Sequence, residues 1–286
     1  MRYWSLSFLL LAGFNFFIWQ QVITGARGDL NLYFLKVGQG DSELAQLPGG
    51  VQILIDGGPD KSVLLELAKA LPANDRYLDM LVMTHPQTDH FAGFFDIVER
   101  YKVGAFIATG REEETETWEN FRKLLEEKQI PIILVEAGSK IIYRENLLEV
   151  LSPDQELLVD KEINESSVIL KLESQGIKAL FTGDAGFLTE NYLTTSQVVN
   201  LDVDVLKVAH HGSKYSSGAN FLAATTPLIS VIEVGKNNYG HPTEATLNRL
   251  KSIGSAVYRT DENGTVRLVV RDGKIAVYPE IHYTSR

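Results

Sequence analysis

Histidine and aspartate residues gather in short loops that follow strand-like segments of this sequence. The segment THPQTDH places His85 directly after a buried apolar run, and Asp89 and His90 follow shortly before a helical segment. Two imidazoles and a carboxylate in one tight loop can point toward a single ion. Neutral imidazole and carboxylate ligands suit Zn²⁺, Mn²⁺ or Fe and need no thiolate. This spacing therefore predicts a metal site.

Three further loops carry residues of the same kinds. Asp184 ends the segment LFTGD, His210 and His211 stand together in KVAHHGS, and His241 precedes a proline in NNYGHP. Adjacent side chains diverge, so one histidine of the pair can ligate a metal while the other contacts substrate or a carboxylate. The sequence leaves open which one ligates. If the four preceding strands share one sheet edge, the loops converge on one cleft. The sixth histidine, His282, belongs to no motif.

Composition narrows the classes of protein that fit. The chain of 286 residues is 44% hydrophobic and 22% charged, which is ordinary for a globular protein. It has no cysteine, which excludes disulfides, thiolate metal sites and a cysteine nucleophile. The formal net charge of −10 argues against coating nucleic acid through overall charge.

The elements that must position these loops are short strands alternating with helices. Residues 30–37 and 51–56 flank a glycine-rich turn, GQGD, and we expect them to be neighbouring strands. More than ten strands with dispersed helices predict an α/β protein with two mixed sheets packed face to face and covered by helices. The further strands are expected at 78–84, 105–108, 132–135, 147–151, 167–173, 178–183, 204–209, 228–234, 256–260, 265–270 and 274–279, and the helices at 61–70, 91–101, 117–129, 218–224 and 243–252.

The N-terminal segment is apolar from Trp4 to Thr24, close to the ~20 residues that a bilayer crossing needs. Trp4 and Trp19 stand near its ends, as in an aromatic belt. We expect a hydrophobic helix that acts as a single membrane anchor. A cleaved signal peptide is the close alternative, because small residues follow at 24–26. Either interpretation divides the chain into an anchor or signal at 1–27 and an exported domain at 28–286. A buried amphipathic helix is the third alternative.

Several segments together resemble the metallo-β-lactamase superfamily and, more closely, the soluble hydrolase-like domain of ComEC-type DNA-uptake channel proteins. The resemblance runs from about Leu30 to the C-terminus and implies a four-layer αββα sandwich with a metal site at one sheet edge. Because the polytopic channel of ComEC has no counterpart here, we expect a stand-alone relative with a single anchor. The segments that carry the resemblance are VGQGDSELAQLPGG, ILIDGG, THPQTDHFAGF, NESSVILKLE, FTGD, LKVAHHGSKYSS, YGHPTEATLNRLKSIG and VYRTDENGTVRLVV.

The resemblance also implies roles for individual residues. The chain departs from the superfamily at Gln87, where a His or Asp is usual, and in the NESS segment, which lacks the histidine found in most members. One Zn²⁺ or Mn²⁺ ion is then expected to bind firmly and a second weakly. The implied ligands of the weaker site are His85, Asp184 and Gln87, and those of the firmer site are Asp89, His90, Asp184 and either His210 or His211.

The chemistry implied is metal-dependent hydrolysis, in which a bound ion lowers the pKa of a water molecule. The expected substrate is DNA or another phosphodiester outside the membrane. Asp89 would orient the water as a base, and Lys207, Lys214 and His241 would contact phosphate. For Lys207, a simple pairing with a carboxylate is an equal alternative. The further residues expected to bind substrate are Asn164, Ser166 and Ser213.

Two other functions stay open at this point. A β-lactamase or lactonase would use the same chemistry on a carbonyl group, although the NESS and HHGS segments depart from the usual histidine set. Alternatively, the chain is a binding module with a decayed site that holds DNA or a channel or competence-machinery partner without cleavage. Gln87 is the residue that best supports this alternative.

Overall fold

A computed structural model describes residues 11–16, 28–111, 115–196 and 200–280 of the chain. Residues 11–16 are helical and exposed. Among the described residues no helix has the length and apolarity to cross a bilayer. The expected anchor or signal peptide falls mainly on 1–10 and 17–27, which lie outside the described residues, and so it stays a prediction.

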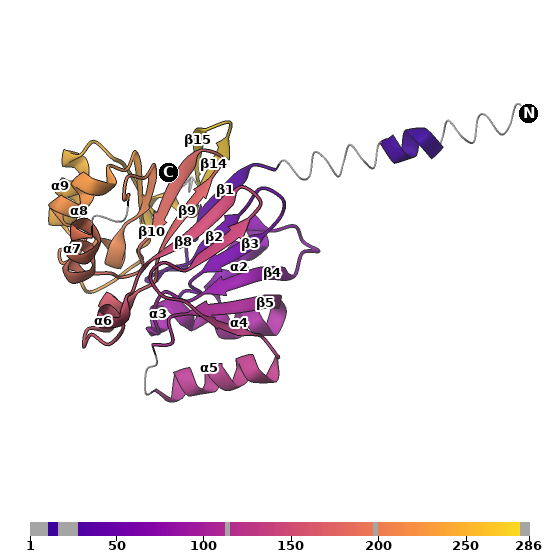
Figure 1. Ribbon diagram of the computed structural model, residues 1–286, viewed down its shortest axis with the longest axis horizontal. Helices are drawn as coiled ribbons and strands as arrows, with labels where there is room; N and C mark the ends of the chain where they lie inside the picture. The colour runs from indigo at the N-terminus through magenta and orange to yellow at the C-terminus, as the bar shows by residue number, and fades with distance from the viewer. Residues whose placement is uncertain (1–10, 17–27, 112–114, 197–199, 281–286) are drawn as a thin grey trace, which may run out of the picture.

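The first layer of strands is a mixed sheet built from the N-terminal half and the last two strands (Figure 1). The order is β15-β14-β1-β2-β3-β4-β5-β6, with parallel pairing from β3 to β6. Its strands are β1 (Leu30–Phe34), β2 (Glu43–Gln46), β3 (Gln52–Ile55), β4 (Tyr77–Val82), β5 (Lys102–Ala108), β6 (Ile132–Leu134), β14 (Val266–Arg271) and β15 (Lys274–Pro279).

The second sheet is formed by the middle of the chain, in the order β13-β12-β11-β10-β9-β8-β7. The pairings from β10 to β13 are parallel. Its strands are β7 (Lys140–Tyr143), β8 (Asn146–Ser152), β9 (Ile169–Ser174), β10 (Ile177–Phe181), β11 (Val205–Lys207), β12 (Ile229–Ile232) and β13 (Ala256–Arg259).

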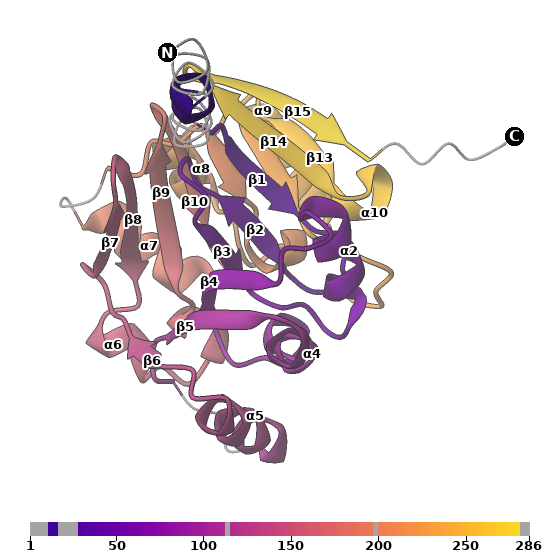
Figure 2. The ribbon, with the colours of Figure 1, turned by 90° about the vertical axis from the view of Figure 1, so that its right-hand side faces the viewer.

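Helices cover the outer face of each sheet, as Figure 2 shows for the first one. Helices α2 (Ser62–Ala70), α4 (Gly93–Arg100) and α5 (Glu116–Glu127) bury Leu67, Phe94 and Phe121 against it. Helices α7 (Phe187–Thr195), α8 (Ala219–Thr225) and α9 (Glu244–Ser252) cover the second sheet. The short helices are α3 (Thr88–Phe91), α6 (Gln155–Leu158), η1 (Ile163–Ser166), η2 (Ala209–Gly212) and α10 (Thr260–Asn263).

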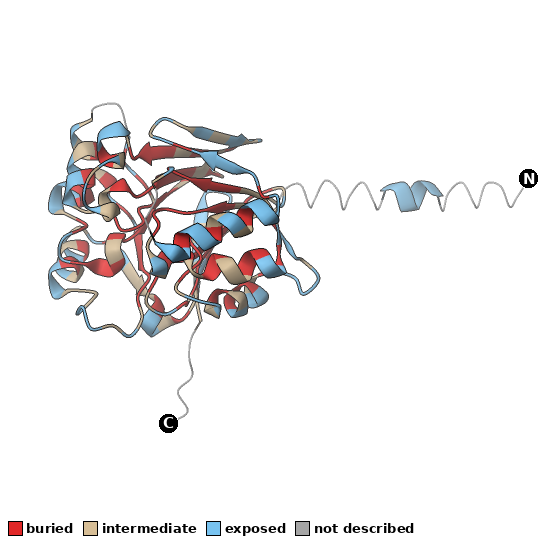
Figure 3. Ribbon diagram, turned by 90° about the horizontal axis from the view of Figure 1, so that it is seen from below, coloured by how far each residue is buried: buried red, intermediate tan, exposed pale blue. Residues whose placement is uncertain are grey.

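The central core lies between the two sheets. Phe34 of β1 stacks on Phe181 of β10, with ring centroids 6.2 Å apart. Figure 3 shows buried strands enclosed by helices whose outer surfaces are exposed. Burial of an apolar face on both sides of each sheet explains why the strands form near-continuous apolar runs. The predicted four-layer αββα sandwich is confirmed.

The sequence-based prediction was wrong about the first two strands. Residues 30–37 and 51–56 are not neighbours, because β2 lies between β1 and β3 and pairs antiparallel with both. The segment ELAQ of β2 has no β-branched or aromatic residue, so local propensity does not mark it as a strand. Pairing on both sides stabilises it instead. Helix α7 and strand β7 also escaped prediction.

Candidate metal centre

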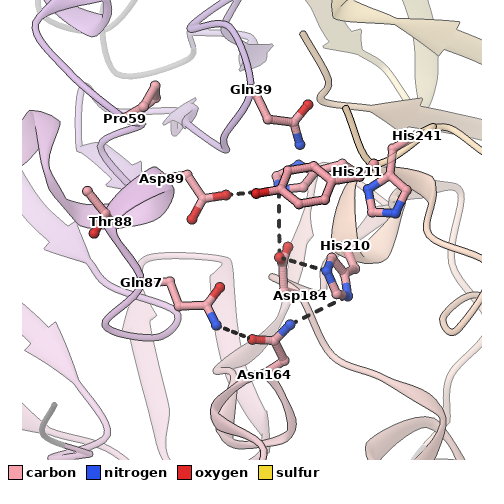
Figure 4. Close-up of a pocket in the computed structure, with 11 residues that line it drawn as sticks. Gln39, Pro59, Gln87, Thr88, Asp89, Asn164, Asp184, His210, His211 and His241 are labelled. Atoms are coloured by element: carbon pink, nitrogen blue, oxygen red, sulfur yellow. Dashed lines mark hydrogen bonds and ion pairs between the residues drawn. The ribbon is translucent and has the colours of Figure 1, made fainter. Parts of the chain in front are cut away.

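The candidate site lies where the carboxyl ends of strands from both sheets meet, and Figure 4 shows the side chains that line its pocket. From the first sheet, β4 leads to His85, and α3 carries Asp89 and His90 in its single turn. From the second sheet, β10 leads to Asp184, and β11 leads to η2 with its histidine pair. The loops that carry these residues therefore converge, as the sequence predicted.

Hydrogen bonds fix which nitrogen of His85 and His90 carries the proton. Thr84 Oγ1 donates its one proton to Asp56 Oδ2 at 2.7 Å, so at its 2.9 Å contact with His85 it must accept from Nδ1. His90 Nδ1 donates to Asp56 Oδ2 at 2.7 Å. In the neutral ring of each histidine, Nε2 is then the free ligand atom. This arrangement, in which an imidazole is held by an acceptor at its other nitrogen, is the common one for metal ligands.

His211 is held in the same way. Its Nδ1 donates to the backbone oxygen of Glu233 at 2.9 Å. Its Nε2 lies 3.4 Å from Asp89 Oδ2 and 3.6 Å from Asp184 Oδ2. On the other side of Asp184, Oδ1 lies 3.4 Å from His90 Nε2. Asp89, His211, Asp184 and His90 thus form a chain of contacts between four potential ligands.

The chemistry of this group fits a divalent cation. Of the described side chains, those with buried atoms that lack a hydrogen-bond partner include His85, His90 and His211 at Nε2 and Asp184 at Oδ1. Buried polar atoms without partners are costly in a folded protein. Ligand atoms of His85, His90 and Asp184, and likewise of Asp89, His90 and His211, lie within 4.8 Å of one another. An ion among them would give these atoms the partner that the protein does not.

Ionisation in the group without a metal shows how strongly it attracts positive charge. Burial opposes the charge on His211, yet the carboxylates of Asp184 and Asp41 raise the pKa of this imidazole to about 10. Burial likewise opposes the charge on His90, but Asp184 and Asp56 raise its pKa well above the usual range. Burial, and then His90, lowers the pKa of His85 to about 3. A cation would displace protons from the first two rings.

The backbone decides how the two adjacent histidines point. His210 and His211 both have φ near 51°, and Gly212 follows with φ 80°. Consecutive left-handed residues turn the chain sharply, and the two rings lie at 77° to each other. The side chain of His211 is 3% exposed and that of His210 is 32% exposed. His210 therefore forms part of the wall of an open pocket, while His211 joins the buried donor group.

The pocket above the donor group has a volume of about 530 Å³. Of the predicted site residues, seven line it, whereas His85 and His90 lie buried beneath. Gln87 Nε2 donates to Asn164 Oδ1 at 2.7 Å, so the two amides that stand at the unusual positions of the family pattern bind each other. The lining residues are Gln39, Pro59, Gln87, Thr88, Asp89, Asn164, Asp184, His210, His211, Tyr239 and His241.

Lys207 does not reach this pocket, and its predicted contact with a phosphate has to be corrected. Its side chain is fully buried, where it forms an ion pair with Asp41 and donates to the Gly183 backbone oxygen at 2.8 Å. Although burial favours the neutral amine, Asp41 and Asp184 raise the pKa of Lys207 above its usual value. The alternative of pairing with a carboxylate is the one observed. Lys207 holds the turn that presents Asp184.

Three residues that were expected to bind substrate are not among those that line the pocket. Ser166 is buried, and its hydroxyl donates to the Ile163 oxygen at 2.7 Å. The buried Ser213 hydroxyl accepts from the Tyr215 amide at 3.3 Å. The Lys214 ammonium lies 4.9 Å from the centre of the Tyr215 ring. The two serine hydroxyls thus form hydrogen bonds to nearby backbone groups, and Lys214 lies over the exposed ring of Tyr215. His282 lies outside the described residues.

Sequence reasoning missed two carboxylates that support the site. Asp56 accepts hydrogen bonds from both His90 and Thr84, and Asp41 lies 3.2 Å from His211 Nδ1. Each is fully buried at the end of a loop or strand. The available signal was an acidic residue in the segments GQGDS and ILIDGG, both quoted above without a role.

The fold and the site define the class of protein. Residues 35–235 match the model of the metallo-beta-lactamase superfamily, and the chain belongs to this superfamily. Among solved structures it resembles the metallo-beta-lactamase fold protein YhfI from Bacillus subtilis, with a TM-score of 0.58 at 12% identity, over 84% of this chain and 99% of that one.

Its curated relatives are competence proteins of the ComEC type. The chain is 30% identical to ComE operon protein 3 of Bacillus subtilis (strain 168) over 96% of its length. It is 29% identical to competence protein ComA of Neisseria gonorrhoeae, also over 96% of its length. The chain spans only 38% and 36% of these two relatives.

Proposed function

We propose that the protein is a metal-dependent hydrolase that cleaves phosphodiester bonds, with DNA as the favoured substrate class. The observation that carries the proposal is a set of three imidazole Nε2 atoms and one carboxylate oxygen that lack hydrogen-bond partners at the floor of an open pocket. The similarity to competence proteins supports DNA rather than another phosphodiester.

Asp89, His90, Asp184 and His211 would hold the firmly bound ion, since contacts of 3.4–3.6 Å link them into one group. His85 and Asp184 would hold a second ion weakly, together with the amide oxygen of Gln87. Imidazole and carboxylate donors suit Zn²⁺ or Mn²⁺. Such an ion supplies a water of lowered pKa and stabilises negative charge on a phosphoryl oxygen.

The protein's own residues would position the reactants around this centre. Despite burial, the nearby imidazole of His211 and the charge of His90 lower the pKa of Asp89 to about 2, so this carboxylate is ionised at neutral pH. It lines the pocket and can accept a hydrogen bond from an attacking water. Burial and the neighbouring His210 lower the pKa of His241, so its neutral ring can donate one hydrogen bond to a phosphate oxygen.

The competing functions make different use of the same pocket. A lactamase or lactonase would place a carbonyl group where the phosphate is proposed to bind. A binding module would hold DNA without cleaving it, and the Gln87–Asn164 hydrogen bond across the weaker site favours this second candidate. Export, membrane anchoring and a channel partner are further parts of the proposal, which rest on the apolar segment Trp4–Thr24 and on the resemblance to ComEC-type proteins.

Metal content and hydrolysis test the proposal together. We expect the full chain, purified without a histidine tag, to contain about one or two Zn²⁺ or Mn²⁺ ions and to cleave bis(p-nitrophenyl) phosphate and oligonucleotides. His90→Ala and Asp184→Asn should abolish metal-dependent turnover, because each removes a ligand atom. Gln87→Asp should strengthen metal binding or raise activity.

Other results would contradict the proposal in distinguishable ways. Turnover of nitrocefin without cleavage of any phosphodiester would identify a lactamase. Single-stranded DNA that is bound but stays intact would identify a binding module. A chain that refuses added Mn²⁺ and Zn²⁺ would overturn the metal site itself.

A further inference from the structure

An exposed aromatic side chain stands at the mouth of the pocket. Tyr239 lies in the loop between β12 and α9, lines the pocket and is 76% exposed. Its ring is therefore accessible to a ligand that enters the pocket, and an aromatic ring can stack on a planar group. Three features indicate the class of ligand. They are the hydrogen bonds that hold the loop of Tyr239, the rings beside it and the charges that line the pocket.

The loop that carries Tyr239 is held in place by one asparagine side chain. Asn237 Oδ1 accepts from the amides of Tyr239 and His241, each at 3.1 Å. Its Nδ2 donates to the oxygens of Gly235 and His241, each at 2.9 Å. The Gly235 amide in turn donates to Gln39 Oε1 at 3.2 Å. The tyrosine is thus presented on a braced loop, which lowers the entropic cost of binding.

Tyr239 is the outer member of a row of rings that leads toward the donor group. Its ring centre lies 5.8 Å from that of His241, at an interplanar angle of 31°. The His241 ring lies 5.5 Å from that of His210, edge to face at 82°. His210 Nε2 lies 3.8 Å from Asp184 Oδ2. A planar group stacked on Tyr239 would therefore be separated from the proposed metal centre by the rings of His241 and His210.

The charges that line the pocket also favour a ligand that is bound by stacking. Among the described residues that line it there is no lysine or arginine, whereas Asp89 and Asp184 are present. Basic side chains are the usual source of affinity for a phosphate backbone. A substrate must gain affinity here from other contacts, and stacking on aromatic side chains is the main alternative for single-stranded nucleic acid. The amides of Gln39 and Asn164 can add hydrogen bonds to base edges.

We propose that Tyr239 is a stacking subsite for a nucleobase next to the phosphodiester that is cleaved. This inference rests on the proposed function and sharpens it, because the pocket would then select phosphodiesters that carry a planar base over base-free ones. Tyr239 is a specificity-determining residue in this scheme, and it takes no part in metal binding or proton transfer.

Binding measurements on the full chain separate this role from catalysis. Fluorescence anisotropy of a labelled oligothymidylate is measured with EDTA and, in parallel, with Ca²⁺ to neutralise the carboxylates. An abasic oligomer of the same length supplies the comparison. We expect Tyr239→Ala to weaken oligothymidylate binding at least about fivefold in the Ca²⁺ series and to leave abasic binding unchanged. Tyr239→Phe and Tyr239→Trp should retain tight binding.

Tyr215 offers a matched control. It is 63% exposed in the loop after His211 but is not among the residues that line the pocket. Tyr215→Ala should leave both affinities unchanged. Competition by thymidine monophosphate would support a base subsite that also serves a free nucleotide, and failure to compete would support a polymer subsite.

Three results would overturn the inference. They are an unchanged affinity in Tyr239→Ala, an equal loss for the abasic oligomer, or no binding of oligothymidylate by the unaltered chain in either series. Base-dependent binding without any metal-dependent cleavage would leave the subsite standing while the proposed hydrolase activity failed. Cleavage that is unchanged in Tyr239→Ala would support the hydrolase activity and contradict the base subsite.

Discussion

At the scale of single residues, the candidate site is organised by the hydrogen-bond acceptors that bind Nδ1 of His85, His90 and His211. Acceptors on Thr84, Asp56 and the Glu233 backbone each take an Nδ1 proton, which leaves Nε2 directed at the common centre. A ring without such an acceptor can rotate and change tautomer. His210 differs, because its Nδ1 accepts a hydrogen bond from Asn164 Nδ2 at 3.5 Å, so that in the neutral ring Nε2 carries the proton.

This difference predicts opposite results for two adjacent substitutions. His211→Ala should reduce metal affinity by more than the roughly 10–100-fold that loss of a supporting partner causes, because it removes a ligand atom. His210→Ala should keep the metal stoichiometry of the unaltered chain and change only substrate binding. Elemental analysis and isothermal titration with Zn²⁺ or Mn²⁺ measure both effects. The reverse pattern would show that His210 is the ligand.

At the scale of elements, one buried carboxylate links α7 to the segment that follows the histidine pair. Glu190 of α7 accepts hydrogen bonds from the backbone amides of Ser217 and Gly218, just before α8 begins. Arg249 of α9 donates to the Ser216 and Ser217 oxygens, each at 2.8 Å. Side chains of two helices, α7 and α9, thereby hold the loop that follows His211.

Glu190 predicts a pH-dependent contribution to stability. Burial raises the pKa of Glu190 to about 7, against an ordinary value of 4.5. Because the folded state binds this proton more tightly, the contribution is present in full below pH 4.5 and is lost as the pH rises through about 7. A shift of this size corresponds to about 3 kcal/mol. In EDTA, Glu190→Gln should therefore gain stability relative to the unaltered chain between pH 5 and 8.

Chemical denaturation at several pH values measures the difference in the free energy of unfolding between Glu190→Gln and the unaltered chain. The titration of most other groups is common to both proteins and cancels in this difference. A difference between the Glu190→Gln variant and the unaltered chain that stays constant from pH 5 to 8 would contradict the assignment.

At the scale of the whole molecule, the donor group joins the two sheets. His85, Asp89 and His90 follow strands of the first sheet, whereas Asp184 and His211 follow strands of the second. The Lys207–Asp41 ion pair also crosses between them. A bound ion would thus bridge two layers that otherwise meet mainly through an apolar core.

Removal of the metal should consequently lower the melting temperature of the entire domain. An ion present at 100 times its dissociation constant stabilises the folded state by about 2.7 kcal/mol. For a domain of this size we expect a loss of roughly 5–10 °C on chelation. Differential scanning calorimetry with and without EDTA measures the shift. His90→Ala should melt at one temperature in both buffers, and an EDTA effect that persists in this variant would contradict the bridge.

The sequence by itself determined the architecture and the kinds of ligand. Alternating apolar strands and amphipathic helices predict the layered sandwich, because burial on both faces of a sheet imposes long apolar runs. The absence of cysteine restricts the metal donors to imidazole, carboxylate and amide groups. Their positions directly after strands predict a common sheet edge, and His85, Asp89, His90 and Asp184 all lie there.

Only the tertiary structure decided which neighbours these residues have. Strand β2 forms because β1 and β3 pair with it, against its weak local propensity. Lys207 turns inward to Asp41, a residue 166 positions away, and not toward a phosphate. The burial of His211 and the greater exposure of His210 depend on two left-handed backbone residues. Each of these outcomes arises from contacts between segments that are distant in the chain, or from dihedral angles that residue types alone do not specify.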